Sequence, residues 1–390
     1  MAHLLIAVIY LAFISLGLPD SLLGSAWPTM TGELSVPLSY AGYISMTISA
    51  GTILSSLMSD RLTRRFGTGI VTCASVLLTA AALFGFSVSD RYIFLILWSV
   101  PYGLGAGSID AALNNYVALN YKSSHMSWLH CMWGVGTVVG PYVMGYALTS
   151  GMTWGMGYRI ISMLQLALGI VILFSLPLWK TRREGADPAV KGGESPTLKK
   201  LLKLDGVPHV LLTFFCYCSL EIVAIVWSGT YLVYKGGFTP ESAASLSSMF
   251  FIGITAGRAV GGFLTYKLSD RVMIRIGEGL IALGVLWLFF LPEGYFALVG
   301  LVLIGLGCAP IYPAVIHSTP EYFGAENSGA LIGIQMACAY TGMCLMPPVF
   351  GWVAEITSPA VFPVVIGAFL AVMAVLHEAL VKKKNVSTIK

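Results

Sequence analysis

Residues 103–121 read GLGAGSIDAALNNYVALNY, an apolar segment in which one carboxylate, Asp110, is followed by the adjacent carboxamides Asn114 and Asn115. On a helix, Asp110 and Asn114 lie on one face because they are four residues apart. Gly103 and Gly107 have the same spacing and predict a face that packs closely against another helix. A carboxylate in the middle of a bilayer costs about 3 kcal/mol on insertion scales. The segment therefore predicts a membrane helix that lines the pathway of an ion or polar solute.

The composition is that of a helical membrane protein. Of the 390 residues, 57% are hydrophobic and 10% are charged, whereas a soluble protein carries roughly a quarter charged residues. The apolar runs are about 20 residues long, the length that crosses a bilayer as a helix. A membrane β-barrel would instead show short alternating segments. We read the net charge of +4 as a topology signal and expect no nucleic-acid partner.

Twelve membrane spans are predicted, which makes the fold an all-α membrane protein. They cover residues 4–30, 38–58, 67–87, 92–119, 125–149, 156–179, 207–232, 242–266, 273–291, 295–317, 328–354 and 359–381.

Internal repetition divides these spans into two pseudo-symmetric six-helix halves, residues 1–180 and 207–390. The GLGAG segment at 103–107 recurs as GLGCA at 305–309, an offset of 202 residues. Residues 181–206 are polar and are predicted to form a cytoplasmic linker. Parallel repeats of this kind are typical of transporters whose solute site lies between the halves.

The basic residues predict the orientation. If both termini are cytoplasmic, almost all of the 22 lysines and arginines fall on the inner side. The N-terminal apolar run lacks a basic leader, so we interpret it as a retained first helix. We expect a multi-pass protein of the plasma membrane, the inner membrane in a bacterium.

Residues 56–67, SLMSDRLTRRFG, follow the second predicted span and resemble the signature loop of the major facilitator superfamily. Ser56 and Thr63 replace two glycines of that pattern. The matching core, with a gating or structural role implied, consists of Asp60, Arg61, Arg64 and Arg65. A cruder copy runs from Gly257 to Arg271 in the second half. Its Arg258 is expected to snorkel to the inner surface or to pair with an acid.

Four further segments resemble the fucose:proton symporter family within that superfamily. They are the Asp110 segment, residues 129–141 (LHCMWGVGTVVGP), residues 217–231 with Tyr217 and Glu221, and residues 305–313 (GLGCAPIYP). The resemblance implies a sugar cavity between the halves, with Asp20 and Asp110 in place of the symporter's two essential acids. His130 and Trp133 stand where the symporter has other residues, so L-fucose itself is not implied.

Three acids, Asp20, Asp110 and Glu221, are predicted to lie well inside spans, while the others fall in loops or near helix ends. A buried carboxyl group titrates closer to neutral pH and can carry a proton. We therefore predict proton coupling through these three acids, with sodium as the alternative ion.

A sugar needs hydrogen-bonding groups for its hydroxyls and an aromatic face for its C–H side. The residues predicted to supply them are Asn114, Asn115, His130, Trp133, Tyr217, Trp227, Tyr312 and Gln335. Three of these have a structural alternative. Trp227 could be an interfacial belt residue, His130 could bond a neighbouring carbonyl, and Gln335 could join two helices.

The sequence thus predicts a monomeric secondary transporter that works by alternating access and imports a sugar or sugar-like solute with protons across the lipid bilayer. No cofactor, metal or enzymatic activity is predicted. A drug:proton exporter is the first alternative, favoured by the glycine and proline pattern of residues 136–145. A nutrient receptor that does not transport is the second.

Overall fold

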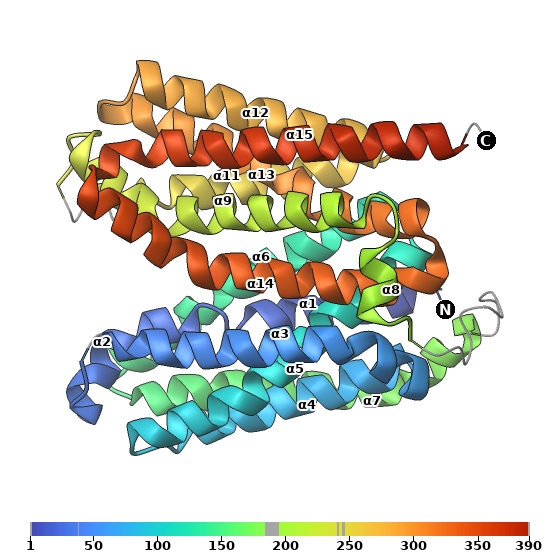
Figure 1. Ribbon diagram of the computed structural model, residues 1–390. Coiled ribbons are helices and arrows are strands. Elements are labelled where there is room, and N and C mark those ends of the chain that lie inside the picture. The colour runs from blue at the N-terminus through green and yellow to red at the C-terminus, as the bar shows by residue number, and fades with distance from the viewer. Residues whose placement is uncertain (1, 38, 184–194, 240–241, 244–245, 389–390) are drawn as a thin grey trace. The chain divides into compact units, whose positions relative to one another are not determined.

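The computed structural model describes residues 2–37, 39–183, 195–239, 242–243 and 246–388 (Figure 1). Within these residues the secondary structure is helical. The helices are α1 (Ala2–Gly17), α2 (Leu22–Leu34), α3 (Tyr40–Phe66), α4 (Thr68–Ser87), α5 (Tyr92–Asn120), α6 (Ser123–Thr149), α7 (Trp154–Arg183), α8 (Leu198–Leu202), α9 (Val207–Tyr234), α11 (Met249–Leu264), α12 (Asp270–Phe290), α13 (Gly294–Phe323), α14 (Ala325–Ile356), the 3-10 turn Pro359–Val361 and α15 (Phe362–Thr388). Residues 184–194 of the predicted linker, 181–206, lie outside the described residues.

The helices agree with the predicted membrane spans. Ten stretches of the described chain are long and apolar enough to cross a membrane, and α11 is a shorter apolar helix. The helix α6 is 27 residues long, although it is less apolar than those ten. The all-α membrane fold is therefore confirmed.

The first predicted span, 4–30, is not one continuous helix. The helix α1 ends at Gly17, residues 18–21 form a turn, and α2 begins at Leu22. Pro19 explains the interruption, because it has no N–H to donate and disfavours helical geometry at the preceding residue. Within the turn, the Asp20 N–H donates to the Gly17 carbonyl at 3.2 Å. Hydropathy alone does not report such a break.

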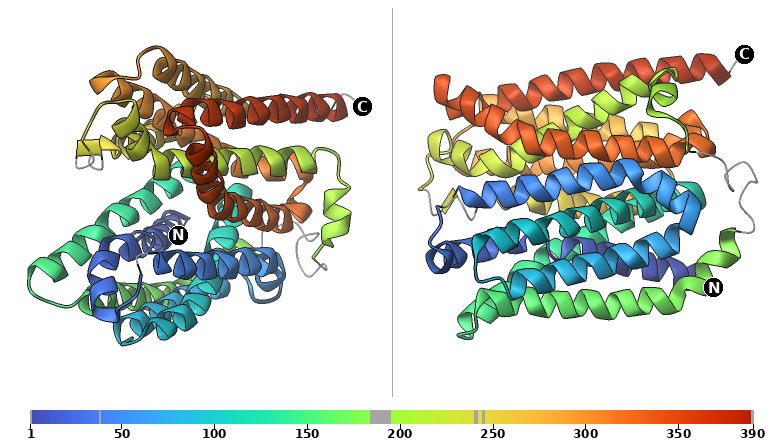
Figure 2. Two further views of the ribbon diagram at one scale, coloured as in Figure 1. Left: turned by 60° about the vertical axis from the view of Figure 1, so that its left-hand side comes forward. Right: turned by 60° about the horizontal axis from the view of Figure 1, so that its bottom comes forward.

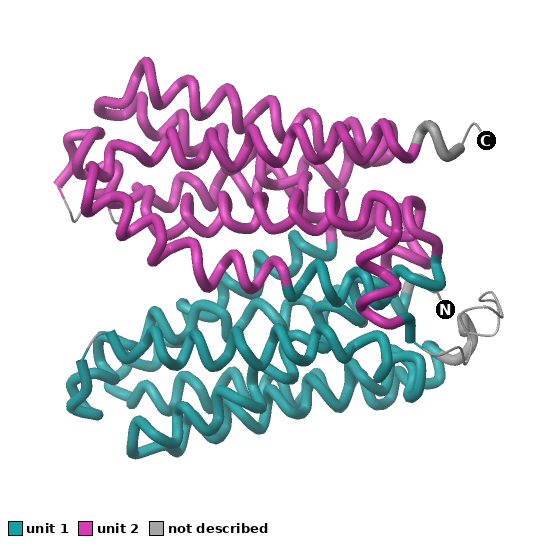
Figure 3. Tube along the Cα trace, in the orientation of Figure 1, with its two compact units in different colours: residues 1–116, 129–196, 325–337 teal, residues 117–128, 197–324, 338–390 magenta. Residues whose placement is uncertain are grey.

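Contacts divide the chain into two compact units (Figure 3). Unit 1 contains Met1–Tyr116, Leu129–Pro196 and Ala325–Ala337. Unit 2 contains Val117–Trp128, Thr197–Gly324 and Cys338–Lys390. Each unit thus consists mainly of one sequence half together with a short segment from the other half. Within unit 1, α4 and α7 run side by side in both views of Figure 2.

The repeated glycine segments make the same contact in both units. A Cβ atom at Gly103 of α5 would lie 2.2 Å from the carbonyl oxygen of Ile48 on α3. A Cβ atom at Gly305 of α13 would lie 2.2 Å from the carbonyl oxygen of Phe250 on α11. Both members of the second contact come 202 residues after those of the first. The close-packing face predicted for Gly103 is therefore confirmed, and the repeat extends to its packing partner.

Candidate functional site

The turn between α1 and α2 presents the carboxylate of Asp20. The indole Nε1 of Trp133 donates to Asp20 Oδ2 at 2.8 Å, and the Tyr102 hydroxyl donates to Oδ1 at 3.1 Å. We predicted a buried acid here, but the Asp20 side chain is exposed. The reason is the helix break, which places Asp20 in a turn. Two aromatic rings thus flank an accessible carboxylate.

Close packing of α1 on α6 brings Trp133 to this turn. A Cβ atom at Gly17 would lie 2.2 Å from the Trp133 carbonyl oxygen, so a larger residue would separate the two helices. A Cβ atom at Gly136, one turn further along α6, would lie 2.2 Å from the carbonyl oxygen of Ile14. The Ser21 hydroxyl also donates to the Thr137 carbonyl at 2.8 Å. Backbone contacts therefore hold this part of α6 against the turn, and the indole itself bonds to Asp20.

Three predicted residues form a buried hydrogen-bonded chain on α5 and α6. The Asn114 Nδ2 donates to Asp110 Oδ1 at 2.8 Å, and His130 Nε2 lies 3.0 Å from Asn114 Oδ1. Since that amide oxygen can only accept, His130 Nε2 carries the proton in this contact. The side chains of Asp110, Asn114 and His130 are 4%, 0% and 5% exposed. His130 thus bonds a side chain of the site, rather than only a neighbouring carbonyl.

The two groups of residues share the same helices of unit 1. Tyr102 and Asp110 both lie on α5, and His130 and Trp133 lie three residues apart on α6. The ring of Phe13 on α1 meets the His130 ring edge-on, with centroids 5.5 Å apart. The exposed carboxyl group of Asp20 and the buried one of Asp110 are therefore held by α5, α6 and the α1–α2 turn.

Glu221 has a basic partner in unit 2. Arg258 Nη2 lies 3.5 Å from Glu221 Oε1, and both side chains are buried. Of the two alternatives for Arg258, pairing with an acid is therefore confirmed. A guanidinium compensates the charge of a buried carboxylate. Glu221 thus has a cationic partner, and Asp110 accepts a hydrogen bond from the amide of Asn114.

Two predicted aromatic residues of α9 bond to backbone carbonyls. The Tyr217 hydroxyl donates to the Cys308 carbonyl at 2.9 Å, and the Trp227 Nε1 donates to the Pro347 carbonyl at 3.1 Å. The Tyr312 ring lies 6.1 Å from that of Tyr217. In this arrangement the polar atoms of Tyr217 and Trp227 join α9 to α13 and α14.

The residues of the signature loop separate into two kinds. Arg64 Nε donates to Asp60 Oδ2 at 2.8 Å, and Arg64 Nη2 donates to the Glu326 carbonyl in the first turn of α14. Arg61 and Arg65 are exposed. Only one of the three arginines therefore belongs to the packed Asp60 cluster, which we define as Asp60, Arg64, Asn115, Glu326, Ser328 and Gly329.

Asn115 lies in this cluster and not in the Asp110 chain. Its Oδ1 accepts a bond from the Ser328 hydroxyl at 2.7 Å. A Cβ atom at Gly329 would lie 2.3 Å from Asp60 Oδ1 and 3.1 Å from Asn115 Nδ2. Gln335, on the same helix α14, is fully buried. The structure thus separates Asn115 from Asn114, its neighbour in sequence.

A buried acid of unit 2, Glu278, was not predicted. His377 Nδ1 of α15 lies 3.3 Å from Glu278 Oε1 of α12, and neither side chain is more than 10% exposed. The expectation that only three acids lie inside spans was therefore wrong. The signal was present, because Glu278 is the sixth residue of the predicted span 273–291.

One family matches nearly the whole chain, and curated proteins are similar to it at lower identity. The Major Facilitator Superfamily pattern matches residues 9–236 and 210–388. Membrane protein MosC of Rhizobium meliloti is 21% identical over 371 residues, covering 92% of this chain and 88% of that protein. The hexuronate transporter of Bacillus subtilis strain 168 is also 21% identical and covers 95% of this chain and 92% of that protein.

Solved structures show the same fold. FucP in the outward conformation has a TM-score of 0.78 at 15% identity, covering 96% of this chain and 98% of that one. The proton:xylose symporter XylE has a TM-score of 0.79 at 12% identity, covering 95% and 94%. At these identities the likeness establishes the architecture and leaves the solute to the residues of the site.

Proposed function

The chain belongs to the Major Facilitator Superfamily, and we propose that this transporter imports a sugar or sugar-like polar solute together with protons. The observation that carries the proposal is the exposed Asp20 carboxylate between the Trp133 indole and the Tyr102 phenol. It lies at a break between two helices, the kind of place where transporters of several folds bind their solutes.

The chemistry around Asp20 suits a polyhydroxylated solute. A carboxylate accepts hydrogen bonds from hydroxyl groups, and an aromatic face covers the C–H side of a sugar ring. Trp133 provides that ring within hydrogen-bond distance of the carboxylate. FucP and XylE are named as a fucose:proton symporter and a proton:xylose symporter, which supports the same class of solute.

A neutral solute fits these residues better than an anion. Two relatives of this chain are named as a hexuronate transporter and a probable nitrate/nitrite antiporter. Asp20 with its two aromatic neighbours, and the chain of Asp110, Asn114 and His130, together hold two carboxyl groups and one imidazole. An anionic solute would meet like charge there unless both acids were protonated.

Asp110 is the proposed coupling residue. When it is ionised it accepts the Asn114 amide hydrogen, and when it is protonated it is a neutral buried group. A negative charge on buried Asp110 costs energy, so Asp110 releases its proton when a conformational change gives it a more polar environment. We assign Asp20 to solute contact and proton exchange with water, since it is exposed.

The remaining features of the proposal follow from topology. We propose that both termini and the linker are cytoplasmic, and that residues 1–180 move against residues 207–390 during transport. Gln335, Tyr312 and Trp227 remain proposed solute contacts from the second half. Labelling of engineered cysteines in intact cells tests the orientation, because an externally labelled linker position would overturn it.

The solute class is tested by the thermal stability of the purified protein in the presence of neutral sugars, uronates and nitrate. A ligand that binds only the folded state raises the apparent melting temperature. We expect neutral sugars to do so, and Asp20→Asn to abolish the shift. Asp205→Asn, which alters an exposed acid outside the spans, is the control. A shift produced only by uronates or nitrate would reject the proposed class.

Coupling is tested in proteoliposomes with Asp110→Asn. The amide has the shape of the carboxyl group but cannot titrate, so accumulation driven by an inward proton gradient should be lost. Exchange of internal for external solute should remain within about threefold of wild type, since the hydrogen bond to Asn114 can be replaced. If the variant still accumulates solute with unchanged pH dependence, Asp110 is not the coupling residue. Accumulation that follows a sodium gradient at constant pH would indicate sodium instead.

A further inference from the structure

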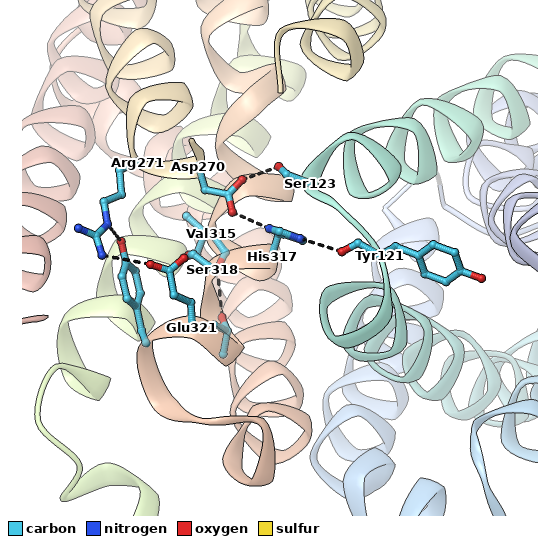
Figure 4. A network of polar contacts seen from close by, with 10 residues as sticks. Tyr121, Ser123, Asp270, Arg271, Val315, His317, Ser318 and Glu321 are labelled. Atoms are coloured by element: carbon cyan, nitrogen blue, oxygen red, sulfur yellow. Dashed lines mark hydrogen bonds and ion pairs between the residues drawn. The ribbon is translucent and has the colours of Figure 1, made fainter. Parts of the chain in front are cut away.

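The junction between α5 and α6 is bonded to the helices α12 and α13 of unit 2 (Figure 4). His317 Nδ1 lies 2.6 Å from Asp270 Oδ2, and His317 Nε2 lies 3.1 Å from the Tyr121 carbonyl oxygen. The Ser123 hydroxyl donates to the other oxygen of Asp270. The His317 ring thus bonds to Tyr121, which follows α5, and the Asp270 carboxyl group bonds to Ser123, which begins α6.

The number of protons in this network follows from the chemistry of its atoms. A backbone carbonyl oxygen only accepts, so the contact with Tyr121 requires a proton on His317 Nε2. A neutral imidazole has one N–H, which leaves Nδ1 as an acceptor facing the carboxyl oxygen of Asp270. All contacts are satisfied only if the pair holds one more proton, as an imidazolium beside a carboxylate or as a neutral imidazole beside a carboxylic acid.

Two helix ends favour the form with a positive imidazole ring. Tyr121 follows the last residue of α5, so its carbonyl lies at the negative end of that helix dipole. Asp270 is the first residue of α12, where the positive end of a dipole stabilises a carboxylate. The ring of His317 therefore lies between two features of negative character, each held in place by a helix.

Further titratable or charged side chains lie near this pair in the sequence. They include Lys122 and His125 beside the junction, Lys267, which is exposed, and Arg271 at the start of α12, and Glu321 and Tyr322 on α13. Arg271 donates to Glu321 at 3.2 Å and to the Tyr322 hydroxyl at 2.9 Å, which compensates the carboxylate of Glu321. Lys122 is exposed, and the His125 ring packs edge-on against the Tyr121 ring at 5.2 Å.

We propose that His317 and Asp270 form a proton-binding site, and that the bound proton holds residues 117–128 against α12 and α13. Loss of the proton leaves the neutral ring with a single donor, so either the carbonyl of Tyr121 or the carboxylate of Asp270 loses its bond. The attachment of the α5–α6 junction then weakens as pH rises. This site is separate from the Asp110 chain and does not depend on which solute is carried.

Replacement of Asp270 by asparagine distinguishes a proton site from an ordinary structural bond. The introduced amide would donate to Nδ1 of a neutral His317 and accept from Ser123, while Nε2–H still donates to Tyr121. Asp270→Asn therefore completes the network without the extra proton. His317→Gln leaves the network incomplete at every pH. Its amide group cannot reach both Asp270 and the Tyr121 carbonyl, and it does not titrate.

The test is hydrogen–deuterium exchange of residues 117–128 in the full-length purified protein, without solute, between about pH 5 and pH 9. After correction for intrinsic exchange, protection in the wild type should fall by up to about tenfold per pH unit through the titration, the limit for one linked proton. Asp270→Asn should stay protected at all pH values. His317→Gln should be less protected throughout and show no titration.

His377→Gln is the matched control, since it removes another histidine of unit 2 that lies beside a carboxylate. Its profile for residues 117–128 should match that of the wild type. Flat protection in the wild type would overturn the proposal. An Asp270→Asn variant that loses protection as pH rises, as the wild type is expected to do, would overturn it as well. Because no solute is present, failure here leaves the proposed transport function untouched.

Discussion

The Asp60 cluster of unit 1 lies in the last turns of α3, the Asp270 site of unit 2 lies at the start of α12, and the two carboxylates have differently charged partners. Asp60 pairs with Arg64 on its own helix, whereas Asp270 pairs with His317 on another helix. Arginine stays protonated at any physiological pH, while histidine titrates within that range. The offset of 202 residues aligns Asp60 with Gly262 rather than with Asp270, so the two carboxylates are not copies of one position and have basic partners of different kinds.

The difference matters because each carboxylate helps to hold a segment from the other sequence half. Residues 325–337 bond to Arg64 and Asn115 in unit 1, and residues 117–128 bond to Asp270 and His317 in unit 2. A fixed charge holds the first segment and a removable proton holds the second. A change of pH is therefore expected to affect the attachment of residues 117–128 and not that of residues 325–337.

The largest expected effect comes from Asp60→Asn, which leaves the mostly buried Arg64 without its carboxylate. Removing one partner of a buried pair costs about 3 kcal/mol or more. We expect a lower melting temperature in detergent at every pH, and a smaller loss for Asp270→Asn because a neutral His317 keeps its bonds. If Asp270→Asn were the more damaging change, the contrast between the two sites would be wrong.

Gly329→Ala tests how tightly the Asp60 cluster is packed. Its added methyl would lie 2.3 Å from Asp60 Oδ1, so the carboxylate or the helix must shift, at a cost of about 1–3 kcal/mol. Gly134→Ala is the control, because a Cβ atom there would meet nothing within 4 Å and alanine favours a helix. Equal melting temperatures for the two variants would contradict the packing argument.

Arg64→Lys separates charge from geometry in the same cluster. Lysine keeps the positive charge but lacks the planar fork with which Arg64 bonds both Asp60 and the Glu326 carbonyl. The loss of one hydrogen bond predicts a decrease of about 1 kcal/mol in the free energy of unfolding. Thermal unfolding measured at two pH values should give the same decrease at both. A pH-dependent decrease would mean that Asp60 itself titrates.

The smallest effect is expected at the exposed pair of Lys383 with Asp205, where Nζ and Oδ1 are 2.8 Å apart. The hydrogen bond from Lys383 lowers the pKa of Asp205 below its ordinary value of 3.8. The contribution of the pair is therefore present at neutral pH and lost as the pH falls below about 4. We expect Lys383→Met to leave the melting temperature at pH 7 unchanged within error. A clear decrease would contradict the expectation that the exposed Lys383–Asp205 pair stabilises the protein less than the buried Asp60–Arg64 pair.

Sequence reasoning succeeded where a property repeats along a helix. Apolar length predicted the spans, and the four-residue spacing of Asp110 and Asn114 placed them together. The same geometry separates Asn115 from Asn114, since neighbouring residues on a helix point in different directions, and this could have been predicted. The break at Pro19 was visible as a proline but was outweighed by hydropathy.

Other features could not be predicted, because their partners are distant in the sequence. His317 is 47 residues from Asp270 and 196 residues from Tyr121. No local pattern reports such a meeting. The bond of Trp227 to a backbone carbonyl 120 residues away is of the same kind. Residue type indicates what these side chains can bind, and only the packing of helices decides what they meet.

The turn between α1 and α2 has a mechanical consequence. A continuous helix resists bending because its hydrogen bonds must stretch, but at Pro19 one of these bonds is already missing. The contact of Asp20 N–H with the Gly17 carbonyl lies within the turn itself. The chain therefore passes from α1 to α2 at a residue that has no N–H to bond, and neither helix gives up a hydrogen bond of its own to make the turn.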